Sequence, residues 1–462
     1  MDGDHGMNQR YTLPIAWMMC GLALAACAQK DTADDQDTTA HSYLEGRITV
    51  DTAVDSVADY RGFEVLVALN NEGEPDTLGF AVTDSSGAFS LDVTAPERGI
   101  YPLIISRRGQ ILRVDELAVA ERDSATLEAT FPRTNRPLRI RSQENAAWVA
   151  YRNTKAQYNQ ALVELVRSGR YDERDVGMRV GQTTMIFWNM RETFPNTMGS
   201  EVASAEAVLM SAGWNDSLAL AWALEIAPEH PSYAAVGRAA RTAQARLVGQ
   251  EAALQLIRDF QDRAVDDEQR AQLQSELVLA HLDSLQHDEA LAAARALSDD
   301  NPGTEWDAWA ARAIYEIENL LPGMAAPPFS ATTYDGESIV LDSLRGRLVV
   351  LEFYRPQDPV YQREFRARNV LYETVGDSSL AIVSVSAEPD TLLNEAFLEG
   401  RDVPGFHVFA PDSLDNAVAR SYNINVLPTR YLIDREGKIV GKYVGSAMAT
   451  LREDVLALGG ES

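Results

Sequence analysis

The two cysteines of this 462-residue chain, Cys20 and Cys27, both lie within its first thirty residues. Every domain beyond Cys27 must therefore fold without a disulfide bond, and without a thiolate as nucleophile or metal ligand. The chain is too long for one hydrophobic core, so we expect roughly two to four domains. Their stability must come from apolar packing, for which a hydrophobic content of 45% is sufficient.

The charge balance excludes several classes of partner. Asp and Glu number 69 against 41 Lys and Arg, which gives a formal net charge of -28. Nucleic-acid binding requires a basic face, so no nucleic-acid partner is expected. The six histidines show no metal-ligand spacing, and no phosphate-binding glycine loop or nucleophile elbow is present. We therefore expect no metal and no cofactor.

The N-terminus has the pattern of an export signal. The apolar run from Leu13 to Ala26 is too short for a permanent membrane span and has the length of a signal-peptide core. It ends in Leu24–Cys27 (Leu-Ala-Ala-Cys), which resembles a bacterial lipobox. That resemblance implies that residues 1–27 are a lipoprotein signal and that Cys27 carries the lipid. The alternative is an ordinary signal peptide that contains a cysteine.

The residues around this signal refine the expectation. Asp2 and Asp4 are unusual in a signal peptide, whose start should be basic, and translation from Met7 would remove them. Ala28 follows the cysteine where an inner-membrane retention signal would have Asp. We therefore expect a cell-envelope protein, anchored by lipid in the outer membrane and facing the periplasm or the surface. Residues 28–44 are polar and acidic, which is typical of a disordered tether.

The next region, residues 45–132, has the texture of an all-β domain. Alternating apolar residues around Val65 and Val67 indicate a strand, and turn signals occur at 70–73 and 84–87. The segment Thr83–Phe89 resembles a hairpin of carboxypeptidase-regulatory-like β-sandwiches. A β-sandwich is therefore predicted, of a kind that serves as a spacer or a binding face.

Residues 133–320 read as helices. A short pattern at Asp216–Ala221 recurs at Glu251–Leu256 and Glu289–Ala294, with offsets close to the ~34-residue period of tetratricopeptide repeats. Such an array would offer a concave face to a peptide or protein. The alternative is an irregular bundle of Ala-rich helices.

The last region, residues 321–462, contains a Pro-x-Phe entry (Pro327–Phe329), an Asp335-Gly336 turn and an apolar strand at 347–354. The segment Tyr422–Val440 then has the form of a cis-proline loop followed by a hairpin. This order resembles the TlpA, ResA and AhpC/TSA branch of the thioredoxin superfamily. The resemblance implies an α/β thioredoxin-like fold over less than a third of the chain.

The same resemblance identifies positions where redox chemistry is expected. In that family a Cys-x-x-Cys motif follows the strand, and here Asp358 occupies the first cysteine position and Tyr361 the second. A peroxiredoxin-style alignment on Phe353-Tyr354 finds no cysteine either. Neither Asp nor Tyr can carry out thiol–disulfide exchange. Asp358, followed by Pro359, is instead expected to cap the helix that begins there.

Two further family features are retained. Leu427, Pro428 and Thr429 match the cis-proline loop, whose backbone pairs with an extended substrate in the family; its alternative role is to shape the turn. Glu352 matches the buried acid that assists proton transfer in thioredoxins. With no cysteine to serve, we expect it to be a hydrogen-bonded structural residue or a strand-end carboxylate.

The sequence thus predicts a multidomain α+β chain: a β-sandwich, an all-α tetratricopeptide-like region and a thioredoxin-like α/β domain. The function we expect is binding or scaffolding of a protein or peptide, with no catalytic residue. The alternative is a thiol–disulfide oxidoreductase or a peroxiredoxin-like antioxidant enzyme. Within the first function, either Tyr354 and Tyr361 line an open groove, or Tyr361 fills it and the helical region binds the partner.

Overall fold

The computed structural model describes residues 39–53, 59–69, 76–132, 138–169, 172–399, 401 and 403–459. They form two compact units, one up to Leu273 and one from Gln274 onward. The predicted signal, the lipid-attachment residue Cys27 and the tether up to residue 38 lie outside the described residues. Among the described residues, no helix combines the length and the apolar character that crossing a bilayer requires.

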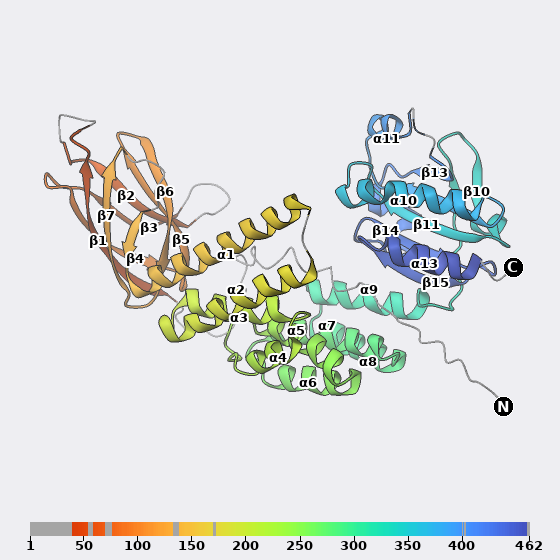
Figure 1. Ribbon diagram of the computed structural model, residues 1–462, viewed down its shortest axis with the longest axis horizontal. Coiled ribbons are helices and arrows are strands. Elements are labelled where there is room, and N and C mark those ends of the chain that lie inside the picture. Colours follow the sequence, from red (N-terminus) through yellow and green to blue (C-terminus); the bar gives the residue numbers. More distant parts are fainter. Residues whose placement is uncertain are drawn as a thin grey trace. The chain divides into compact units, whose positions relative to one another are not determined.

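Two four-stranded sheets open the first unit and share one hydrophobic core (Figure 1). Their strand orders are β4-β1-β7-β8 and β3-β2-β5-β6. Alternation drives this packing: along β7 every second residue is buried, so each strand offers one apolar face to the core. The strands are β1 (Ala40–Val50), β2 (Phe63–Leu69), β3 (Asp76–Val82), β4 (Ala88–Ala95), β5 (Gly99–Arg107), β6 (Gln110–Val119), β7 (Ser124–Phe131) and β8 (Arg139–Arg141).

Two predicted boundaries of the β region need correction. Strand β1 begins at Ala40, inside the predicted tether, and its residues Ala40 and Leu44 are buried against the core. Polar residues alternate with these two, which hid the pattern in the sequence. Strand β8 lies inside the predicted helical region, where three residues are too few to show a period. The predicted turn at 70–73 falls largely outside the described residues.

Helices follow, as predicted, from residue 143. The three copies of the short repeat lie at or next to the beginnings of alternate helices, α4, α6 and α8. The helices are α1 (Gln143–Ser168), α2 (Glu173–Thr193), α3 (Met198–Ser211), α4 (Asp216–Ala223), α5 (Tyr233–Leu247), α6 (Gln250–Asp262), α7 (Asp267–Asp283), α8 (His287–Asp300) and α9 (Glu305–Asn319). The division between the units falls inside α7, so α8 and α9 belong to the second unit and not, as the predicted boundary at 320 implies, to the region before it.

Arg98, in the turn between β4 and β5, joins the sheets to the helices of the first unit. Its guanidinium donates to the carboxylates of Glu144 on α1 and Glu201 on α3, at 3.0 and 3.1 Å, and to the carbonyl of Asn196. Near the same joint, the Asn145 side chain exchanges hydrogen bonds with the backbone of Ala118 on β6. Charged and directional hydrogen bonds therefore fix how the sheets and the helices of the first unit meet.

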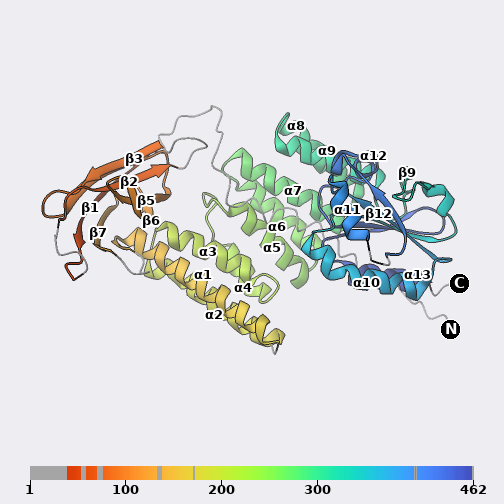
Figure 2. The same cartoon turned by 90° about the horizontal axis from the view of Figure 1, so that it is seen from above.

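The second unit is built on a five-stranded sheet of order β13-β12-β11-β14-β15. Strands β11, β12 and β13 are parallel, and β14 and β15 are antiparallel additions. Helices α10 and α13 cover one face of the sheet in both views (Figures 1 and 2). The elements are β9 (Ser330–Thr332), β10 (Ser338–Val340), β11 (Leu348–Tyr354), α10 (Pro359–Val375), β12 (Leu380–Ser386), α11 (Thr391–Leu398), β13 (Phe406–Phe409), α12 (Ala417–Ser421), β14 (Thr429–Ile433), β15 (Ile439–Val444) and α13 (Met448–Gly459).

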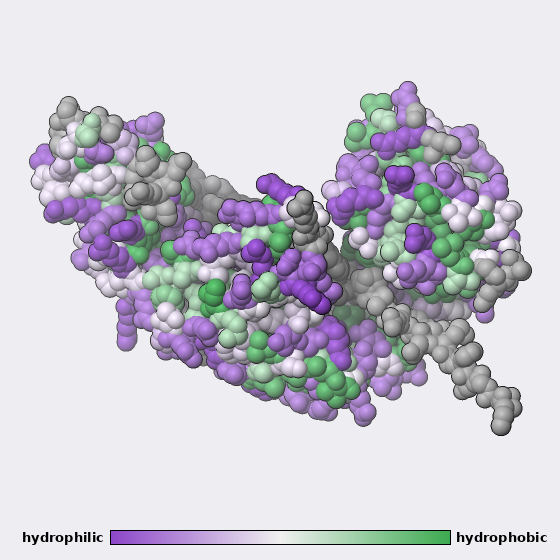
Figure 3. Space-filling view, in the orientation of Figure 1, coloured by the Kyte–Doolittle hydropathy of each residue, from purple (hydrophilic) through white to green (hydrophobic). Residues whose placement is uncertain are grey.

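Helix α9 is fixed to this sheet domain by polar contacts. Glu316 pairs with Lys442 of β15 at 2.8 Å, and both side chains are mostly buried. The Tyr315 hydroxyl donates to the carbonyl of Ser421 at 2.9 Å. These contacts explain why α9 belongs to the second unit. On the face shown in Figure 3, hydrophobic side chains are scattered among hydrophilic ones, as on most water-exposed surfaces.

Candidate functional site

The carboxyl end of β11 leads into α10 through Arg355, Pro356 and Gln357, and Asp358 begins the helix. The Asp358 carboxylate accepts hydrogen bonds from the backbone N–H groups of Val360 and Tyr361, at 2.8 and 2.9 Å. Pro359 occupies the first turn, where its missing N–H has no cost. Asp358 therefore has the N-cap geometry that its sequence context predicts.

Tyr361 fills the space beneath this helix start. Its ring stacks on that of Tyr354, with centroids 4.2 Å apart, and Phe365 and Phe397 contact it edge-on or tilted. Tyr361 and Tyr354 are 0% and 1% exposed. The interpretation in which these two rings line an open groove is therefore wrong, and the alternative in which Tyr361 plugs the site agrees with the structure.

Glu352, in the middle of β11, is the centre of a buried ionic network. Arg368 on α10 donates from Nε to Glu352 Oε1 at 2.8 Å, and Arg430 on β14 donates from Nε to Glu352 Oε2 at 3.3 Å. The antiparallel register places Arg430 directly opposite Glu352. The hydroxyls of Ser384 and Tyr361 also donate to Oε1, at 2.7 and 3.3 Å. The carboxylate is thus fully hydrogen-bonded, as burial of a charge requires.

The two guanidiniums decide the protonation state of Glu352. Burial by itself would raise the pKa of this carboxyl, but the charges of Arg368 and Arg430 outweigh burial and lower the pKa to about 2. Burial also holds the pKa of the Tyr361 hydroxyl well above its ordinary value. Glu352 is therefore a fixed anion and Tyr361 a neutral phenol at any physiological pH, and neither exchanges protons there.

The network continues to the end of the domain through Glu364. Arg430 donates from Nη1 to Glu364 Oε2 at 2.9 Å, and Glu364 Oε1 accepts from the Ser446 hydroxyl and the Met448 backbone N–H. Glu364 thereby ties α10 to the start of α13. Arg430 Nη2 is buried and has no partner among the described residues.

The predicted cis-proline loop lies at the beginning of β14. The Leu427–Pro428 peptide bond is cis. The Pro428 carbonyl accepts from the Gly445 N–H at 2.8 Å, and the Thr429 hydroxyl donates to the Val426 carbonyl at 2.7 Å. Pro428 and Thr429 are buried, and Leu427 is half-buried. The loop is thus held by its own strand and the next.

The structure brings together only some of the residues singled out from the sequence. Glu352 and Tyr361 meet, Asp358 lies above them as a cap, and Thr429 pairs with Phe353 across the sheet. Sequence reasoning missed Arg368 and Arg430. A signal existed for Arg430, because a lone charge inside the apolar run of β14 needs a buried partner. Within the described part of the chain, no three His, Cys, Asp or Glu residues group as a metal site would require.

This architecture, a mixed sheet with a helix starting at the end of its central strand and a cis-proline beside it, defines a thioredoxin-like domain. Residues 322–442 match the model of the AhpC/TSA family. Over 130 residues the chain is 28% identical to the thiol-disulfide oxidoreductase ResA of Bacillus cereus, covering 28% of this chain and 72% of that protein. It is 29% identical over 158 residues to the thioredoxin-like protein YneN of Bacillus subtilis, covering 34% and 89%.

Solved structures resemble the same region. The thioredoxin domain of a thiol-disulfide oxidoreductase from Bacteroides vulgatus is 24% identical, covers 30% of this chain and 99% of its own, and gives a TM-score of 0.27. StoA from Bacillus subtilis is 23% identical, covers 28% and 96%, and gives a TM-score of 0.24. The C-terminal domain belongs to the TlpA/ResA-like proteins of the thioredoxin superfamily. The prediction of that family is confirmed.

Proposed function

We propose that this chain is a cell-envelope lipoprotein whose thioredoxin-like domain is redox-inactive, and that it binds or scaffolds a protein or peptide partner. One observation carries the proposal. At the two positions where the family resemblance implies redox cysteines, the chain has Asp358 and Tyr361, and no cysteine follows Cys27.

The geometry of these two residues supports the loss of redox chemistry. Exchange needs a thiolate that attacks a disulfide and a mixed-disulfide intermediate. The Asp358 carboxylate is occupied by two backbone N–H groups. Tyr361 is 0% exposed and hydrogen-bonds to Glu352, so no substrate reaches it. Both residues stabilise the fold at a place where relatives with cysteines would react.

The second candidate is a thiol–disulfide oxidoreductase or peroxiredoxin-like enzyme. The name of the ResA relative favours it, because that protein is described as a thiol-disulfide oxidoreductase. Against it stands the cysteine content of this chain.

The burial of Tyr354 and Tyr361 favours the helical region as the binding surface. Its recurring pattern at or beside the starts of α4, α6 and α8 supports a tetratricopeptide-like array, and the two sheets before it support a β-sandwich spacer. The Leu24–Cys27 sequence supports lipid attachment at Cys27 and anchoring at the membrane. Labelling with a fatty-acid probe should mark the wild-type protein and not the Cys27→Ser variant; a label that survives the change contradicts the anchor.

Two measurements test the proposed function. Insulin reduction and peroxide consumption by the purified protein should equal the buffer rate, with a cysteine-containing thioredoxin and a peroxiredoxin as the respective positive controls. Affinity capture from membranes should then retain a partner, and deletion of residues 142–266, which keeps helices α7 to α9 and the sheet domain they belong to, should abolish the capture. Turnover that purifies with the protein would instead establish the enzyme.

A further inference from the structure

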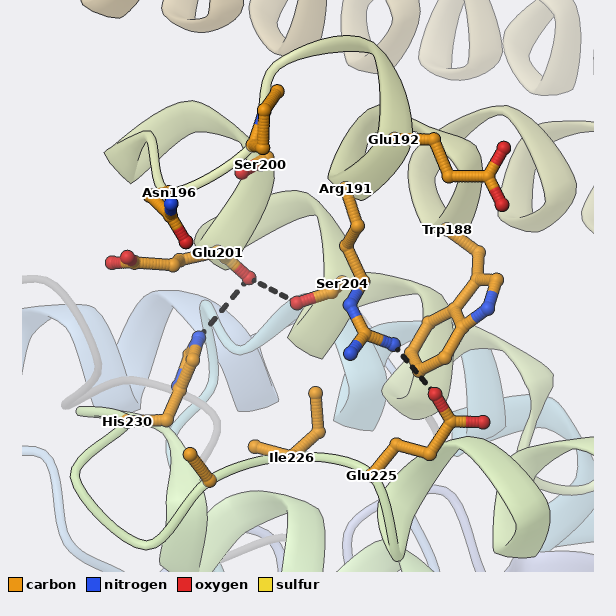
Figure 4. A pocket seen from close by; sticks show the side chains of 12 residues that line it. Trp188, Arg191, Glu192, Asn196, Ser200, Glu201, Ser204, Glu225, Ile226 and His230 are labelled. Atoms are coloured by element: carbon orange, nitrogen blue, oxygen red, sulfur yellow. Dashed lines mark hydrogen bonds and ion pairs between the residues drawn. The ribbon is translucent and has the colours of Figure 1, made fainter.

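A pocket of about 530 Å³ opens in the helical part of the first unit, which the thioredoxin resemblance does not cover (Figure 4). Its walls come from the last turn of α2, the start of α3 and the connection between α4 and α5. We call it the Trp188 pocket. Since the three segments are separate in the sequence, the pocket exists only in the folded unit.

Hydrogen bonds within the protein occupy the polar groups at the floor of the Trp188 pocket. The Glu201 carbonyl accepts from the Ser204 hydroxyl at 2.8 Å and lies 3.0 Å from His230 Nε2. His230 Nδ1 accepts from the Ser232 N–H at 2.9 Å, so the ring is neutral and donates from Nε2. The Glu201 carboxylate shares Arg98 with Glu144, so its charge is partly compensated outside the pocket.

One wall already holds a guanidinium. Trp188 stacks on Trp222, with ring centroids 4.7 Å apart, and the guanidinium carbon of Arg191 lies 4.2 Å from the centre of the Trp188 ring. Arg191 donates from Nη1 to Glu225 Oε2 at 3.0 Å. Figure 4 shows Arg191 beside the Trp188 ring, with a dashed line from its guanidinium to the Glu225 carboxylate. Contact with an aromatic ring and with a carboxylate stabilises a guanidinium.

The remaining open groups are mainly acceptors. Glu192 has no hydrogen-bond or ion-pair partner among the described residues, and Glu225 has used only one oxygen. Even apart from Glu201, two carboxylates and one guanidinium line the pocket, so its lining carries a net negative charge. The net charge of -28 adds a field that draws cations to it.

We propose that the Trp188 pocket binds a cationic side chain, an arginine of a protein partner, through the carboxylates of Glu192 and Glu225 that line it. The proposal rests on the proposed binding function and gives that function a location and a chemistry. An anionic ligand would meet two carboxylates. A sugar or base would need a free aromatic face, and the Trp188 ring is already in contact with Trp222 and Arg191.

The test uses the full-length protein and a pair of blocked peptides, acetyl-Gly-Arg-Gly-amide and its citrulline counterpart, which has nearly the same shape and no charge. Titration calorimetry should detect the arginine peptide, with binding that weakens as salt rises, and no citrulline binding. The Glu192→Gln/Glu225→Gln variant should bind the arginine peptide about tenfold more weakly. Glu251→Gln, an exposed change on α6 outside the pocket, is the matched control and should bind as the wild type does.

Three outcomes of the titrations overturn the proposal. These are equal affinity for the citrulline peptide, unchanged affinity in the double variant, and tighter binding of free spermidine than of the arginine peptide, which would assign the pocket to a polyamine. If affinity capture still retains a partner in the double variant, the pocket is not the site and the proposed function stands. If capture fails in every variant including Glu251→Gln, the proposed function itself fails.

Discussion

The thioredoxin-like site and the Trp188 pocket are made of the same chemical parts, arginines, glutamates and stacked aromatic rings, and differ in their access to water. In the first, the Arg368 and Glu352 side chains are 1% and 0% exposed; in the second, those of Arg191 and Glu225 are 36% and 58% exposed. In the buried site each charged group depends on its ion-pair partners, because water cannot replace them, and the network therefore stabilises the fold. In the open site water can replace any partner, so the same groups can exchange partners and bind a ligand.

The largest effect is expected from breaking the buried network. Glu352→Ala leaves two buried guanidiniums without their shared partner and should lower the free energy of unfolding of the second unit by about 3–5 kcal/mol. Glu225→Ala, which removes the open pair, should change stability by no more than about 0.5 kcal/mol. Hydrogen exchange of the β11 and α2 amides reports the two regions separately. Equal losses of stability in Glu352→Ala and Glu225→Ala would contradict the distinction between the buried and the open site.

Next in size is the loss of the aromatic plug. Tyr361→Ala removes a fully buried ring that contacts three others and should destabilise the second unit by roughly 3 kcal/mol. Tyr361→Phe keeps the ring and loses only the hydrogen bond to Glu352, which should cost about 1 kcal/mol. Hydrogen exchange of the β11 amides, measured across a denaturant series, reports the loss of stability in each variant. If the two variants were equally stable, the ring would not be what holds the site closed.

Lowering the pH should also affect the stability of the two regions differently. The folded-state pKa of Glu352 is about 2, against an ordinary value of 4.5, so its stabilising contribution is complete above pH 4.5 and is lost as the pH falls toward 2. Exchange at β11 should accelerate across that window in the wild type. Glu352→Gln should remove this part of the pH dependence, and Glu225→Gln should retain it. An identical pH profile for wild type and Glu352→Gln would contradict the pKa argument.

The smallest effect concerns the cap. Asp358→Ala removes two hydrogen bonds from the first turn of α10 and should lower stability by about 1 kcal/mol. Asp358→Asn, which can still cap, should recover most of the loss. The denaturation midpoint of the second unit is the readout, and an unchanged midpoint in Asp358→Ala would show that the position is structurally neutral.

The sequence was sufficient for those parts of the second unit that depend on neighbouring residues. The β11 strand follows from an unbroken apolar run, and the cap follows from Asp358 and Pro359 at the start of a helical pattern. The buried network could not be derived this way. Arg368 and Arg430 lie 16 and 78 residues from Glu352, and only the strand register and the packing of α10 bring them to it.

The structure of the first unit was harder to predict from the sequence, because it too depends on contacts between residues that are distant along the chain. The start of β1 was missed because only Ala40 and Leu44 mark its buried face among polar residues. The Trp188 pocket left no signal at all. Its shape depends on how the turn after α2 and the connection before α5 pass each other, which no local pattern encodes.

The place of β1 in its sheet has a mechanical consequence. The strand that follows the N-terminal segment is not at an edge: it pairs antiparallel with β4 on one side and parallel with β7 on the other. A pull on the chain ahead of Ala40, directed along the strand, would load both hydrogen-bond ladders together in shear, so the bonds would have to fail as a group. An edge strand pulled across its ladder would unzip one bond at a time. A chain held at its N-terminus would thus resist force at the first element that force reaches.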